Sequence, residues 1–318
     1  MNVLVTGGAG FIGSHLVQAL AARGDRVAVL DSFDAFYDPK LKRETAKRLK
    51  ADVIEGDLNN EADVARAFAA AGPTPVVVHL AARAGVRPSI LQPALYARVN
   101  VEGTTNMLEA ARKAQALRFV FASSSSVYGA RSNPPFTEED RIDRPVSPYA
   151  ATKIAGEMLC ATWSHLYALQ TVALRFFTVY GPRQRPDLAI SKFAKLIRNG
   201  EKVPFFGDGS TARDYTFVED TVRGLVAAVD RAWPQFDVIN LGGARPVTLT
   251  ELVQGIEKAA GRKAVLDRQP LQPGDVPLTC ASVAKSERLL GFKAQVPLDV
   301  GLKRYFEWLD GDEAASWR

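Results

Sequence analysis

The stretch TGGAGFIG, residues 6–13, joins a short apolar segment to an amphipathic one, and its glycines Gly7, Gly10 and Gly13 recur every three residues. Small residues at such a junction let the backbone turn and approach a pyrophosphate, which the first N–H groups of the following helix can bind. Asp31 closes the next apolar segment, where a carboxylate would accept hydrogen bonds from an adenosine ribose and repel a 2′-phosphate. The stretch therefore predicts a strand–turn–helix unit that binds NAD rather than NADP.

The same alternation of apolar and amphipathic segments continues through the first half of the chain. The apolar segments are residues 2–6, 26–30, 51–55, 76–80, 119–123 and 171–176, and the amphipathic ones are 11–22, 40–49, 61–70, 96–113 and 148–167. Runs such as residues 75–78, PVVV, are continuously apolar, which is typical of strands that helices cover on both faces. The pattern predicts an α/β fold with a doubly wound parallel sheet, the Rossmann arrangement.

The pattern changes after residue 175, where prolines separate shorter segments. Helices are expected at residues 189–199, 250–260, 282–290 and 298–309, and a return to the sheet is expected near residues 237–241. We expect an NAD-binding domain of residues 1–174 with a return segment at about 215–241. Residues 175–214 and 242–318 would form a smaller C-terminal substrate-binding lobe.

Composition and residue types exclude several functional classes. A nucleoside-triphosphate loop would continue with Lys and Ser or Thr, whereas Gly13 is followed by Ser14 and His15. Metal ligation is not expected, because the histidines and cysteines are few and scattered: His15, His79, His165, Cys160 and Cys280. We expect His79 to be a satisfied core histidine, His15 to pack or cap its helix, and the cysteines to be free thiols.

Charge and hydropathy narrow the partners further. The 318 residues carry 40 Lys and Arg against 35 Asp and Glu, a formal charge of +5 without any long basic run, so we expect no nucleic-acid partner. No apolar stretch approaches the roughly 20 residues that a membrane span needs, so we expect a cytoplasmic protein with no membrane partner.

A second motif opens the segment at residues 148–167. Tyr149 and Lys153 in YAATK are four residues apart and so share one helix face, where a Lys ammonium favours the phenolate of a neighbouring Tyr. A Tyr needs such neighbours to act as a base near neutral pH, because its ordinary pKa is near 10. The run ASSSSVYG, residues 122–129, follows an apolar segment and would present hydroxyls at the end of a strand.

Together these motifs resemble the extended short-chain dehydrogenase/reductase family, in particular its nucleotide-sugar epimerase/dehydratase branch. The resemblance spans nearly the whole chain and includes TGGAGFIGSH, HLAA, SSSSVYG, YAATK, LRFFTVYGPR and RDYTFVED. It implies a tightly held NAD, a nucleoside diphosphate sugar in the C-terminal lobe, and catalysis by Ser124, Tyr149 and Lys153. The implied NAD contacts are Gly7, Gly10, Phe11, Ile12, Gly13, Asp31, Asp57, Leu58, Leu80, Ala82 and Asn100, together with Tyr149 and Lys153. By analogy with the family, residues 96–113 and 148–167 would form a homodimer interface.

The serine run narrows the reaction. Related 4,6-dehydratases carry an Asp-Glu pair, and related uronate decarboxylases a Glu, where this chain has Ser125 and Ser126. Hydroxyls donate and accept hydrogen bonds but cannot supply that acid/base chemistry. The resemblance therefore implies reversible oxidation at the sugar C4, which is epimerisation.

Two further positions favour a uronate substrate. Thr178 stands where neutral-hexose 4-epimerases usually have Asn, and Gln272 stands where they usually have Arg. The segment FTVYGPRQRPD, residues 177–187, and FYDP, residues 36–39, are similar to those of epimerases that interconvert UDP-glucuronate and UDP-galacturonate. The resemblance thus implies NAD-dependent 4-epimerisation of a UDP-sugar, most closely UDP-glucuronate, without decarboxylation.

Six residues are candidates for binding that substrate: Ser125, Ser126, Thr178, Arg185, Arg213 and Asp275. A guanidinium at Arg185 could bind the C6 carboxylate in bidentate fashion, unless Arg185 is an exposed loop residue. Arg213 would contact the diphosphate, unless it forms a structural pair with Asp214. A UDP-glucose/UDP-galactose 4-epimerase and an NAD(H)-dependent 4-keto-sugar reductase remain as alternatives.

Overall fold

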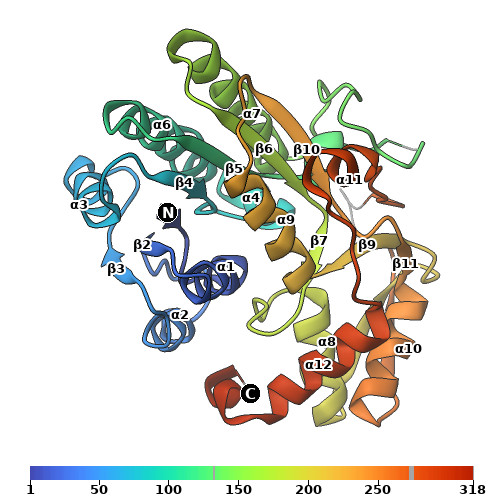
Figure 1. Cartoon of the computed structure of the whole chain (residues 1–318). Coiled ribbons are helices and arrows are strands. Elements are labelled where there is room, and N and C mark those ends of the chain that lie inside the picture. The colour runs from blue at the N-terminus through green and yellow to red at the C-terminus, as the bar shows by residue number, and fades with distance from the viewer. Residues whose placement is uncertain (132, 272–275, 318) are drawn as a thin grey trace.

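A parallel sheet of seven strands runs through the middle of the molecule in the order β10-β6-β5-β4-β1-β2-β3 (Figure 1). The computed structural model describes residues 1–131, 133–271 and 276–317. The strands of this sheet are β1 (Asn2–Thr6), β2 (Arg26–Asp31), β3 (Asp52–Glu55), β4 (Val76–His79), β5 (Arg118–Ser124), β6 (Thr171–Phe176) and β10 (Asp237–Leu241). Every pair of neighbours is parallel. Each predicted strand agrees with the structure to within one residue at either end.

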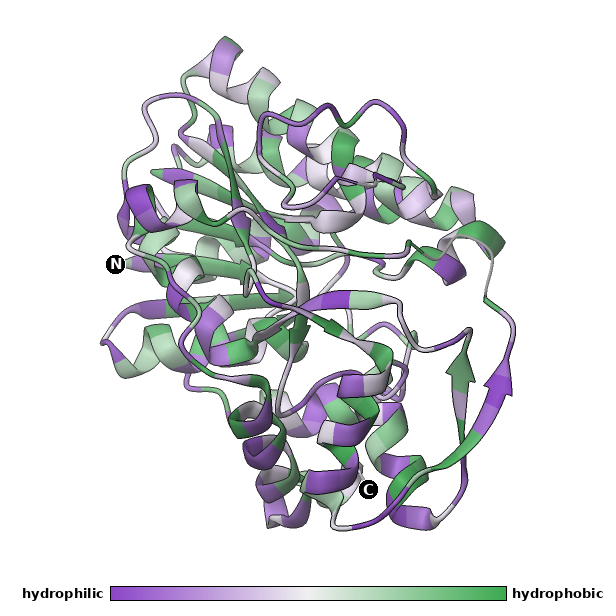
Figure 2. Cartoon of the chain, turned by 90° about the vertical axis from the view of Figure 1, so that its right-hand side faces the viewer, coloured by the Kyte–Doolittle hydropathy of each residue, from purple (hydrophilic) through white to green (hydrophobic). Residues whose placement is uncertain are grey.

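Helices cover both faces of this sheet, which confirms the predicted doubly wound fold. One face carries α1 (Phe11–Ala22) and α9 (Val218–Asp230), and the other carries α3 (Glu61–Ala71), α6 (Gly103–Lys113) and α7 (Pro148–Tyr167). Figure 2 shows the consequence, since the central strands are largely hydrophobic while the surrounding helices mix hydrophobic and hydrophilic residues.

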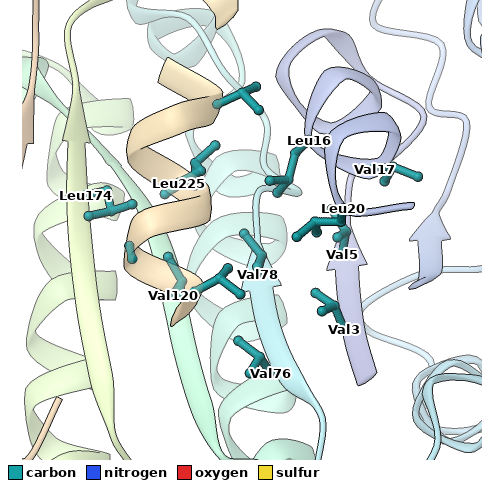
Figure 3. Close-up of a cluster of buried hydrophobic side chains, with 14 of the residues drawn as sticks. Val3, Val5, Leu16, Val17, Leu20, Val76, Val78, Val120, Leu174 and Leu225 are labelled. Carbon is teal, nitrogen blue, oxygen red and sulfur yellow. The ribbon is translucent and has the colours of Figure 1, made fainter. Parts of the chain in front are cut away.

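The strands are continuously apolar because successive side chains enter two different cores. Val3 and Val5 of β1 pack in the core under α1 and α9, whereas Leu4 between them packs in the core under α3, α6 and α7. Figure 3 shows Leu20 of α1 and Leu225 of α9 over the first of these cores. Fully burying such a side chain contributes roughly 1.5–3 kcal/mol, so both faces of the sheet must stay covered.

The predicted helix over residues 96–113 is continuous in the structure, but residues 98–102 within it are π-helical rather than α-helical. The chain there forms α5 (Pro93–Ala97), a π-helical turn, η1 (Arg98–Glu102), and only then α6. The hydroxyl of Thr104 donates a hydrogen bond to the carbonyl oxygen of Asn100, so this carbonyl group in the wider turn has a side-chain partner. The remaining elements near the sheet are α2 (Pro39–Ala46), α4 (Val86–Leu91) and the short 3₁₀ turn η2 (Ser125–Tyr128).

The C-terminal part of the chain adds two small sheets and four helices. Three of these helices lie below the large sheet in Figure 1, whereas the helix Ala284–Leu290 packs against β10 and α9. These elements are β7 (Thr178–Tyr180), α8 (Ala189–Asn199), β8 (Lys202–Phe206), β9 (Ala212–Phe217), β11 (Pro246–Thr248), α10 (Leu249–Ala260), β12 (Val265–Gln269), α11 (Ala284–Leu290), α12 (Leu298–Asp310) and η3 (Asp312–Trp317). The four helices were predicted to within two residues, whereas the five short strands and α9 were not. Strands as short as β7, with only three residues, leave too little pattern to be recognised.

Among the described residues, no helix combines the length and the apolar character that a membrane crossing requires. Cys160 and Cys280 both carry free thiols, as expected.

Candidate active site

A cavity of about 1050 Å³ lies at the carboxyl ends of the central strands. This is the edge of a doubly wound sheet where ligands usually bind. Most of the predicted site residues line it: Gly7, Gly10, Phe11, Ile12, Gly13, Asp31, Asp57, Leu58, Leu80, Ala82, Ser124, Ser125, Ser126, Tyr149, Lys153, Thr178, Arg185 and Arg213. Asp275 and Gln272 lie outside the described residues. The fold thus brings together residues as far apart in the sequence as Gly7 and Arg213.

The glycine turn is packed so closely that side chains would not fit. Gly7 adopts a positive φ of 69°. A Cβ on Gly13 would lie 2.2 Å from the carbonyl oxygen of Gly7, far inside contact distance. Gly10 precedes α1 and provides no side-chain cap, so the first N–H groups of the helix face the cavity without a competing side chain. The turn therefore fits a dinucleotide pyrophosphate.

Asp31 is held rigidly at the end of β2. Its carboxylate is buried and accepts hydrogen bonds from the backbone N–H groups of Ala9 (3.1 Å) and Phe33 (2.9 Å). Lys42 of α2 forms an ion pair with it at 3.4 Å. Sequence reasoning missed Lys42, because no motif connects a helix residue to a strand end eleven positions earlier.

Asn100 is the one described NAD-contact candidate that does not line the cavity. Its buried side chain accepts a hydrogen bond from the N–H of Arg83 and donates to the carbonyl oxygen of Arg83 and the hydroxyl of Thr152. These two donations use both amide protons. Asn100 therefore fixes the backbone of Arg83, which lines the cavity, without lining the cavity itself.

The histidines behave as packing residues. His79 is fully buried and bridges Thr6 of β1 and Thr104 of α6 with hydrogen bonds of 2.8 and 3.0 Å. Its pKa is lowered to about 3 by burial and by the charge of Lys153. His15 contacts the carbonyl oxygen of Pro182 at 2.9 Å. The expectations of a satisfied core histidine and of a packing residue are both confirmed.

Tyr149 stands in the first turn of α7, where Ser147 caps the helix by accepting a hydrogen bond from the N–H of Ala150. Burial raises the pKa of the Tyr149 phenol, and a hydrogen bond with Ser124 and the charge of Arg185 only partly oppose it. The phenol of the protein by itself thus stays protonated near neutral pH. A further positive charge beside it would act in the lowering direction.

Lys153 lies one helical turn further on, with Nζ 6.0 Å from the centre of the Tyr149 ring. Its ammonium donates to the carbonyl oxygen of Ala122 at 2.7 Å. Burial lowers the pKa of Lys153 to about 8, although Cys160 and Glu157 act to raise it. Lys153 therefore retains its charge at neutral pH and loses it in mildly alkaline solution.

The serines following β5 have different surroundings. Ser124 accepts hydrogen bonds from the hydroxyl and the backbone N–H of Ser126, at 2.8 and 3.2 Å. Ser125 and Ser126 face the cavity in the turn η2. The hydroxyl of Ser123 donates to the carboxylate of Glu157 at 2.5 Å. Ser124 is thus the serine placed against Tyr149.

Arg185 is not an exposed loop residue, because only 16% of its side chain is accessible. Its guanidinium is bidentate with Asp187, at 3.0 and 2.7 Å, and lies over the ring of Phe36 at 4.8 Å. Arg83 stacks on the same ring at 5.4 Å. Sequence reasoning found Arg185 but not this neighbourhood, because Phe36 reaches it from about 150 positions away.

Arg213 of β9 reaches the cavity. Its sequence neighbour Asp214 is fully buried and accepts hydrogen bonds from the N–H groups of Gly243, Ala244 and Ala281. Asp214 therefore organises loop backbone, which makes a purely structural Arg213–Asp214 pair the weaker interpretation.

The fold and the cavity are those of a dinucleotide-dependent enzyme, and the cavity brings Tyr149 and Lys153 together with Ser124. Residues 3–242 match the model of the NAD dependent epimerase/dehydratase family, and the chain belongs to that family. This confirms the family that the motifs indicated.

Known relatives cover almost the whole chain. UDP-glucuronate 4-epimerase 5 of Arabidopsis thaliana is 42% identical over 98% of this chain and 76% of its own. The structure of UDP-glucuronic acid 4-epimerase from Bacillus cereus in complex with UDP-glucuronic acid and NAD is 34% identical, with a TM-score of 0.88 over 97% of this chain and 99% of that one. UDP-glucose 4-epimerase from Thermotoga maritima with UDP-glucose is equally similar, at 34% identity and a TM-score of 0.89 over 97% and 98%.

Proposed function

We propose that this protein is an NAD-dependent 4-epimerase of UDP-sugars that interconverts UDP-glucuronate and UDP-galacturonate. The observation that carries the proposal is a single cavity that is lined by Tyr149, Ser125, Ser126 and Arg185, with the charge of Arg185 acting on the Tyr149 phenol. Relatives that are named UDP-glucuronate 4-epimerases support it.

The cavity fits NAD, because Gly7 and Gly13 leave no room for side chains and Asp31 ends β2 as a fixed acceptor. We assign the pyrophosphate to the turn and to Phe11 and Ile12, and the adenosine side to Asp31, Asp57 and Leu58, with Leu80 and Ala82 forming the opposite wall. NAD supplies the site that accepts the C4 hydride of the sugar and returns it.

The chain's own part is the movement of one proton at the sugar O4. Tyr149 takes this proton as the C4 carbonyl develops and gives it back when the alcohol reforms. Ser124, which is hydrogen-bonded to Tyr149, lies where it can hold the same oxygen. The charge of Lys153 favours the ionised phenol, and its hydrogen bond to Ala122 fixes that charge beneath the ring.

The same site must prevent loss of the carboxylate. A 4-keto uronate is a β-keto acid, which loses CO₂ when the bond between C5 and the carboxylate aligns with the carbonyl π-system. We propose that Arg185, Thr178, Ser125 and Ser126 hold the carboxylate out of that alignment. A guanidinium has more N–H donors than the two that Asp187 occupies, so Arg185 can bind a second carboxylate. Arg213 is assigned to the diphosphate, and Asp275 to substrate contacts from the sequence resemblance alone.

One observation favours the neutral-hexose alternative. Asp187 already compensates the charge of Arg185, which weakens the attraction of this corner for a substrate carboxylate. A UDP-glucose/UDP-galactose 4-epimerase is therefore the second candidate. A 4-keto-sugar reductase is a third, and it would consume added NADH.

The test is incubation of the purified protein with UDP-glucuronate and with UDP-glucose in separate reactions, without added cofactor, followed by NMR of the products. Formation of UDP-galacturonate from the first substrate alone supports the proposal. UDP-galactose from the second alone would establish the neutral-hexose activity. If neither sugar is epimerised and NADH is oxidised with a 4-keto sugar, the reductase is correct.

Two further proposals concern the domain boundaries and the oligomeric state. We propose that residues 1–174 form the NAD-binding domain and that residues 175–214 and 242–318 form the sugar-nucleotide lobe. We place the return segment of the NAD-binding domain at about residues 215–241, which includes α9 and β10, and the pairing of β10 with β6 in the large sheet supports this assignment. We also propose a homodimer through α7, whose Met158, Leu166 and Tyr167 are each about half exposed, and light scattering in solution would test it.

A further inference from the structure

A fully buried ion pair lies directly behind the proposed catalytic residues. The guanidinium of Arg175 in β6 is bidentate with the carboxylate of Glu157 in α7, at 2.9 and 2.8 Å. Arg175 is 2% exposed and Glu157 is not exposed at all. Neither residue was a candidate site residue in the sequence analysis, although Arg175 stands in the motif LRFFTVYGPR.

The pair is connected to both ends of the serine run. At the start of the run, Ser123 donates to Glu157 at 2.5 Å. At its end, the Tyr128 hydroxyl accepts a hydrogen bond from Arg175 at 3.0 Å and donates to the side chain of Asn240 at 2.7 Å. The segment 123–128 is therefore hydrogen-bonded at both ends to the buried Glu157–Arg175 ion pair. Ser124, Ser125 and Ser126 lie between the two hydrogen-bonded residues.

The same unit fixes the catalytic helix. Tyr149, Lys153 and Glu157 follow each other at intervals of four residues and so lie along one face of α7. Lys153 holds the carbonyl oxygen of Ala122, the residue immediately before Ser123. Two consecutive residues of β5 are thus bound by two consecutive turns of α7, which sets the register between the strand and the helix.

Stability alone does not explain such a pair. Removing two charges from water costs about as much as their attraction returns, and apolar residues of similar volume are often as stable or more so. Beyond stability, the pair fixes the orientation of the groups that are hydrogen-bonded to it, because a bidentate guanidinium accepts few arrangements of its partners.

We propose that Glu157 and Arg175 are positioning residues that hold the serine segment 123–128 against α7 and thereby set Ser124 relative to Tyr149 and Lys153. This inference rests on the proposed epimerase function. Neither residue touches the reacting atoms in this arrangement, and each acts through Ser123 or Tyr128.

The test removes the two connections and leaves the ion pair in place. Ser123→Ala deletes the donor to Glu157, and Tyr128→Phe deletes the hydroxyl that joins Arg175 to Asn240. The matched controls are Ser286→Ala and Tyr305→Phe, which each remove one buried hydroxyl with one hydrogen bond, far from the cavity. All four variants are compared with the unmodified protein by kcat, KM and urea denaturation.

We expect kcat to fall about tenfold in Ser123→Ala and in Tyr128→Phe with KM nearly unchanged, because small displacements of catalytic groups can cost as much as about a hundredfold. The controls should lose similar stability and keep kcat within about twofold. If all four variants keep kcat, or if the two site variants lose activity only in proportion to folded protein, the positioning role is refuted.

A double replacement provides the second measurement. Glu157→Leu combined with Arg175→Met removes both charges and both connections while retaining volume, and the pair is expected to fold. A folded double variant with full kcat would refute the inference, and one with kcat reduced at least tenfold supports it. Failure of the epimerase proposal is seen separately, as an unmodified protein that epimerises neither UDP-sugar.

Discussion

Replacing Lys153 with methionine is expected to stabilise the protein while it removes activity. Burial lowers the pKa of Lys153 from 10.5 to about 8. Each pKa unit corresponds to about 1.36 kcal/mol, so the buried ammonium costs roughly 3 kcal/mol at pH 7. Methionine has a similar length and carries no charge, and its main loss is the hydrogen bond to Ala122, worth about 1 kcal/mol. The net gain in the free energy of unfolding is therefore about 2 kcal/mol.

The stability advantage of Lys153→Met should also depend on pH. Below pH 8 the lysine is protonated in both the folded and unfolded protein, so the full cost is present. Between about pH 8 and 10.5 the unfolded chain binds more protons than the folded one, and the stability contributed by Lys153 rises with pH. The advantage of Lys153→Met should therefore shrink as the pH rises through this window.

The assay is urea denaturation of both proteins at pH 7 and pH 9.5, with Lys195→Met as the control for loss of an exposed lysine. The control should show no advantage that depends on pH. If Lys153→Met is less stable than the unmodified protein at pH 7, or if its advantage is the same at both pH values, the attribution of the pKa to burial is refuted.

Three further outcomes are expected. Tyr149→Phe should lower kcat by about a hundredfold to ten-thousandfold, as loss of a general acid/base does, and calorimetry should show that UDP-glucuronate still binds. The Arg185→Ala variant should release CO₂ and a 4-keto pentose from UDP-glucuronate. The Asp187→Asn variant should have a lower KM for this substrate, because the guanidinium of Arg185 is freed. Unchanged epimerisation and affinity in Arg185→Ala would contradict the role of Arg185. Stability should fall as the pH drops from 6.5 toward 3, because His15 and His79 have pKa values lowered to about 3 and the unfolded chain binds their protons first. At pH 4.5 each histidine should lower the free energy of unfolding by roughly 2–3 kcal/mol relative to pH 7, and a His79→Gln variant should lose correspondingly less stability between these pH values.

The parts of the fold that were predicted are those whose burial is repeated along the chain. Strands such as β1 and β6 are covered on both faces, so their residues are apolar without interruption and their bounds could be read directly. β9 has the sequence ARDYTF, in which buried and half-buried positions alternate and the buried ones include Asp214. That carboxylate is compensated by three loop N–H groups that only the folded chain brings together, so no local pattern indicates a strand there.

The residues of the site also fall into a predicted and an unpredicted group. Gly7, Gly13, Tyr149 and Lys153 were predicted because the chemistry fixes their spacing within one turn or one helix. The contacts that involve Phe36, Lys42, Arg175 and Asp187 were not predicted. Glu157 was also missed, although it follows Lys153 on α7 at the same four-residue spacing. Most of these neighbours reach the cavity or the catalytic helix from distant segments, and Asp187 was not recognised although it stands only two residues from Arg185. A spacing rule describes contacts within an element, while these contacts depend on how elements pack.

Those neighbours also explain how the site can be both buried and reactive. Burial shifts both members of the pair toward neutrality, since it raises the pKa of Tyr149 and lowers that of Lys153. Nearby charges oppose both shifts: Arg185, from a distant segment, acts to lower the pKa of the phenol, and Glu157, one turn further along α7, acts to raise that of the ammonium. Because Tyr149 is partly buried, a further positive charge that enters the cavity acts on the phenol with less screening than in water. Binding of an oxidised nicotinamide would therefore be the event that makes Tyr149 a base, and the pKa of the phenol should fall on NAD binding. A spectroscopic titration of the tyrosinate absorbance, with Tyr149→Phe as the reference, measures this fall directly, and an identical titration with and without NAD would refute the coupling.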